Sequence, residues 1–244
     1  MNILYLHQED LRVHDNQALL EACEHEVLAV YVHEQPLSSW TALCLQDLQT
    51  SYQEREANLL VLRGETQQIL LNLIHTYDID AVYCQETTAN KELLDALAET
   101  IPVKTYETYT LYLKKQLPKT LPSNKEEFIA VTHNKIYPPL AFAPPKTIPC
   151  LPAEYENMAV QGSQEGVVEP GEQAALQALH KYFLGEEKRE TIQTYFDYGL
   201  LSVRKAWYDA QEEQTRQAQE LLKYLEQREY ELQTTLLAQR SNFL

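Results

Sequence analysis

Residues 4–19, LYLHQEDLRVHDNQAL, are the stretch that decides the fold of this chain. They begin in a short apolar run, which also includes Ile3, and continue into seven mostly polar residues. Asp15 and Asn16 then open a predicted helix, because short polar side chains favour helix N-termini. A strand, a loop and a helix N-terminus in this order indicate a βαβ unit, whose loop lies at the sheet edge where ligands usually bind.

The next hundred residues repeat this alternation of apolar strands and amphipathic helices. We expect strands at residues 3–6, 26–32, 59–62, 79–84 and 103–106, and helices at residues 41–56, from Thr66 as N-cap onwards, and at residues 89–99. The pattern predicts an α/β fold with a doubly wound, mostly parallel, five-stranded Rossmann-like sheet.

Glycine-rich phosphate cradles are absent from the sequence. The chain has only six glycines, no G-x-G-x-x-G motif after a strand and no G-x-x-x-x-G-K-[ST] motif. Neither the usual dinucleotide fingerprint nor a P-loop is therefore present. A ligand of this sheet must be held by other groups.

The chain divides into three segments of different character. We assign residues 1–116 to the α/β domain, residues 117–170 to a proline-rich connector, and residues 171–244 to a small α-helical domain. The connector carries nine of the eleven prolines and one short predicted helix at residues 125–136. In the last segment we expect helices at residues 171–183, from the cap Ser202 to about residue 211, and at residues 218–237.

Charge and cysteine usage restrict the class of protein. Twenty Lys and Arg residues against 36 Asp and Glu residues give a net charge of −16, which argues against general binding to DNA phosphates. The four cysteines, Cys23, Cys44, Cys84 and Cys150, stand far apart and form no C-x-x-C pair. We expect buried free thiols and a reducing cytoplasm. No signal peptide and no apolar run of about 20 residues is evident, so we expect no membrane span.

Five sequence landmarks resemble DNA photolyases and cryptochromes, most closely the DASH branch of cryptochromes. The first is Asp10-Leu11-Arg12 followed by Asp15-Asn16, which is similar to the family's R-x-D-L-R-x-x-D-N opening, with Gln8 at the first arginine. The others, in family order, are Thr110-Leu111-Tyr112 with Leu117-Pro118, GEQAAL at residues 171–176, IQTYFDYGLLSVR at residues 192–204, and LEQREY at residues 225–230.

The resemblance implies an antenna-type α/β domain followed by the start of a helical FAD-binding domain. Because the later FAD-binding segments have no counterpart here, it suggests a truncated member of the family. The family holds the flavin phosphates with a G-T-S-like stretch, where this chain has Lys188-Arg189-Glu190, and it has a tryptophan at the position of Gln227. A glutamine cannot replace an indole face in stacking. The family-matched flavin contacts that remain are Ser202 and Arg228.

Antenna domains of this family hold a folate, a deazaflavin or a flavin beside the loops after strands one, two and four. The side chains that these loops offer here are mostly acidic or neutral, which disfavours a phosphate-bearing chromophore and suits a neutral or cationic group. The candidates for this cleft are His7, Gln8, Glu9, Asp10, Arg12, Glu34, Gln85 and Glu86.

The same residues can instead have a purely structural role, without binding a ligand. Charged residues at strand ends are usually solvated, Asp10 and Arg12 would then pair within the loop, and Asp15 or Asn16 would cap the helix. A zinc site from His7, His14 and His33 lacks the usual ligand spacing. The sequence has no G-x-S-x-G turn and no cysteine placed as an activated thiolate.

Three hypotheses on function follow. The first is a non-catalytic binding or regulatory module without flavin photochemistry and with no resident cofactor, which uses its helical segment to bind a protein partner or a second copy. The alternative is an FAD-dependent, light-driven deoxyribodipyrimidine photolyase or DASH-type cryptochrome that works with a missing partner domain. A weaker alternative is a small-molecule or nucleotide binder of the Rossmann-like class.

Overall fold

A computed structural model describes residues 1–85, 90–106, 122, 124–132, 136, 146–147 and 168–241, with side chains to residue 235. Its central feature is a parallel sheet with strand order β3-β2-β1-β4-β5. The strands are β1 (Asn2–His7), β2 (Glu26–His33), β3 (Leu59–Arg63), β4 (Ala81–Gln85) and β5 (Val103–Tyr106). The predicted five-stranded, parallel Rossmann-like sheet is thus confirmed, and a sixth strand that we did not predict, β6 (Lys146–Thr147), pairs with the start of β2.

Alternating side chains of each strand face two different helical layers. In β1, Ile3 and Tyr5 pack into one apolar core, whereas Leu4 and Leu6 pack into the other, as the two-residue period of a strand requires. The first core includes apolar residues of α1 (Gln17–Ala22) and α2 (Ser39–Gln53), and the second those of α3 (Thr66–Thr76) and α4 (Lys91–Ala98). The sheet is therefore doubly wound, as predicted.

The helix N-termini agree with the predicted caps except at α3. The side chain of Asn16 accepts a hydrogen bond from the backbone N–H of Leu19 at 3.1 Å and caps α1. Thr66, the predicted cap of α3, is instead the first residue inside that helix, and Glu65 is the N-cap. The helix start predicted at Thr66 is confirmed. Its predicted role as the cap was wrong, because a glutamate side chain can also reach the first free N–H groups.

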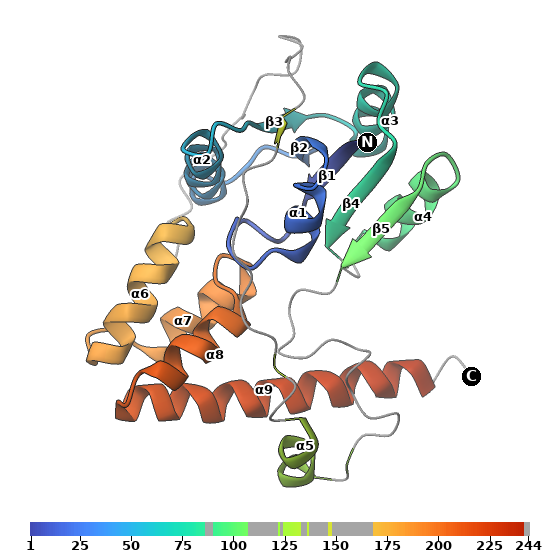
Figure 1. The fold of residues 1–244 in the computed structure, drawn as a ribbon. Helices are drawn as coiled ribbons and strands as arrows, with labels where there is room; N and C mark the ends of the chain where they lie inside the picture. Colours follow the sequence, from blue (N-terminus) through green and yellow to red (C-terminus); the bar gives the residue numbers. More distant parts are fainter. Residues whose placement is uncertain are drawn as a thin grey trace.

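The C-terminal segment is helical, as predicted. It consists of α6 (Glu172–Leu184), α7 (Arg189–Asp197), α8 (Val203–Glu212) and α9 (Arg216–Ser241). Figure 1 shows α9 along the base of the molecule, with α8 on one side and α5 (Lys125–Thr132) on the other. Most of the predicted connector, including Cys150, lies outside the described residues.

One apolar core continues from the sheet into the helical segment. Leu45 and Leu48 of α2 belong to the same cluster as Leu179 of α6 and Trp207 of α8, and all four are almost completely buried. Helix α6 packs directly against α2. The α/β and helical segments are therefore joined by shared hydrophobic burial as well as by polar contacts.

Gly199, between α7 and α8, lies where the backbones of the two segments come close together. Its φ angle is +64°, and a Cβ atom built there would lie 1.8 Å from the backbone oxygen of Glu9. Real Cβ atoms do not come so near a carbonyl oxygen. Only glycine lets the loop after β1 and the start of α8 meet at this distance.

We expect Gly199→Ala to lower the free energy of unfolding by at least about 3 kcal/mol, because it adds a backbone clash to the strain of a left-handed residue. Gly185→Ala is the matched control, since Gly185 has φ +78° and its added Cβ would meet only the Gln217 side chain at 3.0 Å. That control should cost about 1 kcal/mol. Equal losses in urea denaturation would contradict the close-approach explanation.

Candidate functional site

A cavity of about 510 Å³ lies at the carboxyl edge of β1 and β2 and is bordered by the N-terminal ends of α3 and α4. Its size falls within the range of small-molecule sites, about 300–1,000 Å³. Leu6, Val32 and Leu93 supply apolar wall, and Tyr31 adds an aromatic ring. This is the edge at which open α/β sheets bind ligands.

His7 in the cavity wall is held by two buried neighbours. Its Nδ1 lies 3.0 Å from the backbone oxygen of Asp10, and its Nε2 lies 2.8 Å from the Tyr52 hydroxyl. Because a carbonyl oxygen only accepts, Nδ1 donates to it, and Nε2 shares its hydrogen bond with the Tyr52 hydroxyl. Both ring nitrogens are therefore engaged, so His7 shapes the cavity more than it offers a free donor.

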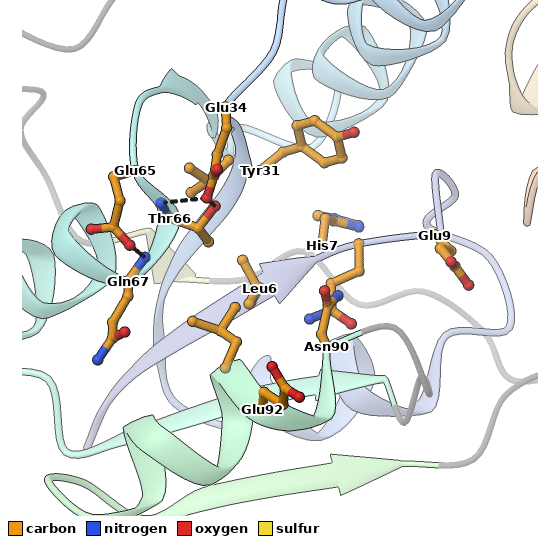
Figure 2. A pocket seen from close by; sticks show the side chains of 13 residues that line it. Leu6, His7, Glu9, Tyr31, Glu34, Glu65, Thr66, Gln67, Asn90 and Glu92 are labelled. Atoms are coloured by element: carbon orange, nitrogen blue, oxygen red, sulfur yellow. Dashed lines mark hydrogen bonds between the residues drawn. The ribbon is translucent and has the colours of Figure 1, made fainter.

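Two glutamates close the N-terminus of α3 at the cavity (Figure 2). Glu65 accepts hydrogen bonds from the backbone N–H groups of Gln67 at 3.1 Å and Gln68 at 2.7 Å. Glu34 accepts from the backbone N–H of Thr66 at 3.2 Å and from its hydroxyl at 3.0 Å. Helix N-termini bind phosphate through such free N–H groups, and here the protein's own carboxylates occupy them.

Two further carboxylates, those of Glu9 and Glu92, belong to the cavity wall. No hydrogen bond or ion pair joins either one to another residue in the described part of the chain. No Lys or Arg is among the described residues that line the cavity. The site therefore has a strongly acidic character.

The structure brings together four of the predicted cleft residues, His7, Gln8, Glu9 and Glu34, in the cavity wall. Three others, Asp10, Arg12 and Gln85, are buried and lie outside that wall. Glu86 lies outside the described residues. The sequence analysis missed Glu65, Asn90 and Glu92, which begin α3 and α4; the positions of those helix starts were the available indication.

Asp10 organises the interior of the first loop. Its carboxylate accepts hydrogen bonds from the Tyr5 hydroxyl, from the Asn16 amide at 2.9 Å and from the backbone N–H of Gln8 at 2.9 Å. Burial alone would raise the pKa of Asp10, but nearby His7 and these hydrogen bonds outweigh it, so its pKa is lowered. The predicted Asp10–Arg12 side-chain pair was wrong: Arg12 instead donates to the backbone oxygen of Gly199 at 2.8 Å.

Asp15 forms a buried ion pair with the helical segment. Its carboxylate oxygens lie 2.8 Å from Nη2 and 3.0 Å from Nε of Arg204, and they also accept from the Ser202 hydroxyl. Asp15 is 1% exposed and Arg204 is 4% exposed. This bidentate geometry is the strongest form of an arginine–carboxylate contact, and it fixes α8 against the first loop.

Glu172, the first residue of α6, makes a second polar contact to the first loop. Its carboxylate accepts from the backbone N–H groups of Val13 at 3.0 Å and His14 at 2.9 Å, and it pairs with the His14 ring. Burial would raise the pKa of Glu172, but the contacts with His14 and Val13 lower it overall. The backbone N–H of Glu172 in turn donates to Asp47 at 2.8 Å, and burial raises the pKa of Asp47.

Comparison with known proteins shows which proteins this chain is similar to. Residues 3–112 match the DNA photolyase family model. A cryptochrome DASH of Idiomarina loihiensis is 28% identical over 225 residues, which cover 78% of this chain and 49% of the relative. The chain is similar to DNA photolyases and cryptochromes, and the match to the family model covers its α/β segment. A deoxyribodipyrimidine photo-lyase of Thermus thermophilus is 26% identical over 238 residues, which cover 86% of this chain and 54% of the relative.

The chain spans about half the length of these two photolyase-family relatives. An uncharacterized 31.6 kDa protein of Synechococcus sp. is 24% identical and is matched over 87% of its length and 84% of this chain. The cryptochrome of Synechocystis sp. superposes with a TM-score of 0.79 at 19% identity, covering 94% of this chain and 60% of its own. An archaeal photolyase of Sulfolobus tokodaii with two FAD molecules gives 0.73 at 19% identity, with 94% and 58% covered. The structural matches show a shared fold.

The photolyase-family flavin contacts carried over to this chain lie in the helical segment. The Ser202 hydroxyl is 1% exposed, bonds Asp15, and accepts from the backbone N–H groups of Arg204 and Lys205 as the cap of α8. Arg228 lies partly buried on α9. Both lie away from the cavity wall, and their roles as flavin contacts stay predictions.

The stretch that replaces the photolyase-family phosphate loop begins α7. The Glu187 carboxylate accepts from the backbone N–H of Lys188 at 2.8 Å and from the Thr191 hydroxyl at 2.9 Å. The Arg189 guanidinium lies 5.4 Å from the centre of the Tyr224 ring. A carboxylate of the chain itself thus lies beside the start of α7, while Arg189 stacks on an aromatic ring.

Metal-dependent and thiol-based chemistries find little support among the described residues. Among the described residues, no group of three or more His, Cys, Asp or Glu side chains is arranged to hold a metal ion. Burial raises the pKa of the free thiols Cys23, Cys44 and Cys84 to about 12, so they are not activated nucleophiles. Within the same residues, no helix has the length and apolarity needed to cross a membrane.

We expect Asp15→Ala and Arg204→Met each to lower the free energy of unfolding by about 3–5 kcal/mol, since each leaves a buried charge unpaired. The double variant should lose less than the sum of the two. Asp209→Ala, which removes a partly exposed pair with Lys205 in the same helix, should cost no more than about 1 kcal/mol. Additive losses in a double-mutant cycle would show that the buried pair has no special coupling.

The lowered pKa of Glu172 predicts a pH dependence. An acid whose pKa is lower in the folded state adds stability above its unfolded value, about 4.3, and that stability is lost as the pH falls through the folded pKa. Glu172→Gln should therefore flatten the loss of unfolding free energy below about pH 4.5.

The residual acid dependence of that variant should come largely from Asp10, whose pKa is also lowered, whereas Asp47, with a raised pKa, acts in the opposite direction. Glu186→Gln, at an exposed position after α6, should keep the wild-type pH profile. Urea titrations at several pH values measure both variants. Identical slopes for Glu172→Gln and wild type would refute this role of Glu172.

Proposed function

We propose that this chain is a non-catalytic, ligand-binding member of the DNA photolyase and cryptochrome family, without flavin photochemistry of its own. Its ligand would be a small molecule without phosphate groups, held in the cavity at the carboxyl edge of the sheet. The observation that carries this proposal is the closed N-terminus of α3, where Glu34 and Glu65 occupy three backbone N–H groups. A phosphate at this helix end would have to displace two carboxylates of like charge.

The helical segment supports the same conclusion for FAD. A diphosphate needs donors, but the Glu187 carboxylate lies just before α7, where it accepts from the backbone N–H of Lys188, and Glu190 adds another carboxylate to the first turn of the helix. Gln227, at the family's tryptophan position, donates to Glu231 at 2.6 Å along α9. Hydrogen bonding between two neighbouring polar side chains does not reproduce a stacking surface. We therefore propose neither FAD nor a phosphate-bearing antenna chromophore as a resident cofactor.

The second candidate is light-driven, FAD-dependent repair of pyrimidine dimers, with further helices supplied by another chain. The similarity to a cryptochrome over 94% of this chain favours it, because the segments retained are in the family's arrangement. The net charge of −16 argues against DNA as a partner. A protein partner or a second copy bound through α6–α9, and a cytoplasmic location that suits the free thiols, complete the proposal.

The test compares lumiflavin, a neutral three-ring flavin without a phosphate, with FMN, which has the same rings and a phosphate. We expect lumiflavin to bind with a Kd on the order of tens of micromolar, from about 0.3 kcal/mol per non-hydrogen atom. FMN should bind at least about tenfold more weakly, because its phosphate meets the carboxylates of the cavity. Fluorescence titration measures both, and gel filtration after incubation with FAD should leave the chain without visible absorbance.

Two tryptophan variants locate the binding. Leu93→Trp fills the cavity wall and should abolish lumiflavin binding, whereas Leu184→Trp, at a 59% exposed position on α6, should not change it. Stoichiometric retention of FAD by the purified chain would contradict the proposal and favour the photolyase alternative. FMN binding equal to lumiflavin binding would contradict the exclusion of phosphate.

A further inference from the structure

We propose that the cavity selects an organic cation, recognised by the Glu9 and Glu92 carboxylates together with the Tyr31 ring. This inference rests on the proposed binding role of the cavity and names the chemical class of its ligand. It depends on which carboxylates in the wall already accept hydrogen bonds from the protein and which do not.

Four glutamates line the cavity, and they divide into two pairs. Glu34 and Glu65 satisfy the N-terminal N–H groups of α3, whose dipole offsets roughly half an elementary charge. Glu9 and Glu92 contact no basic group in the described part of the chain. An anion brought into this cavity would lose water and be repelled by these carboxylates, whereas a cation would be attracted by them.

The N-terminus of α4 is the one feature of the wall that would by itself attract an anion. Asn90 is its N-cap and makes no side-chain capping hydrogen bond. However, Glu92 stands in the first turn of the same helix, where a carboxylate already interacts favourably with the helix dipole. Lys91, the first residue of α4, is exposed and is not part of the cavity wall, whereas Glu92 is. Among the described wall residues at the two helix ends, the charged side chains are therefore carboxylates.

Tyr31 supplies an aromatic surface in the same wall (Figure 2). Burial first, and then the nearby Asp10, raise the pKa of Tyr31, so its ring stays a neutral phenol. A cation over the face of such a ring gains about 0.5–2 kcal/mol. Carboxylates beside an aromatic ring favour a cation that is itself flat and partly apolar.

The size of the cavity separates an organic cation from a metal ion. At about 510 Å³, it is far larger than one coordinated ion requires and matches a ligand of two or three rings. The described residues contain no cluster of side chains arranged to hold a metal. A protonated amine or amidine on an aromatic frame fits these observations.

The experiment adds proflavine, a three-ring cation, to lumiflavin and FMN, so that a cationic, a neutral and an anionic probe with flat three-ring frames are compared. At low salt we expect proflavine to bind about tenfold more tightly than lumiflavin, and the difference should shrink as salt screens the carboxylates. Glu9→Gln and Glu92→Gln should each weaken proflavine binding about three- to fivefold, with less than about twofold effect on lumiflavin. Glu24→Gln is the matched control, because Glu24 is exposed at the opposite end of the sheet, and it should change neither affinity.

The outcomes distinguish this inference from the proposed function. If lumiflavin binds at least as tightly as proflavine and Leu93→Trp abolishes both, the cavity binds ligands but does not select cations. If proflavine binding is insensitive to Leu93→Trp or to both glutamine variants, the dye binds elsewhere on the acidic surface and the inference is wrong. If neither ring compound binds, the proposed function fails together with the inference.

Discussion

The buried ion pair between Asp15 and Arg204 is the contact on which the relation between the two segments depends. It joins the loop after β1 to the start of α8, more than 180 residues further along the chain. Around it, Glu172 bonds the backbone of the same loop and Gly199 admits the loop's carbonyl at short range. Because buried charges are tolerated only when paired, these contacts are satisfied together only when the helical segment is docked.

That docking gives the first loop two separate surfaces. On its inner side, Asp10 is bonded to Tyr5 and Asn16 and holds the loop rigid. At its beginning, His7 and Glu9 belong to the wall of the acidic cavity. The loop that supports the candidate site is therefore positioned by contacts with residues around 172 and 199–204, which lie far from the cavity in sequence.

Most of the fold was predictable from the sequence, but only four of the thirteen described residues in the cavity wall were predicted. Strands such as Leu59–Arg63 are continuous apolar runs, which single out buried parallel strands. The cavity residues that follow strands, such as Glu9 and Glu34, were predicted because the carboxyl ends of parallel strands meet at one edge. Glu65 and Glu92 were missed because their place in the wall depends on where α3 and α4 start. The roles of Asp10 and Arg12 depend on three-dimensional contacts that no local pattern records.

The close approach at Gly199 gives the first-loop motif a structural role that does not depend on photochemistry. The Asp-Leu-Arg and Asp-Asn elements of the first loop contact this glycine and the start of α8. Selection can therefore keep these residues wherever an α/β segment must pack against such a helical segment. A search that uses these elements as a fingerprint will therefore retrieve a shared architecture, whatever the retrieved proteins do with light. Separating photochemical members from the others requires residues that would touch the chromophore itself.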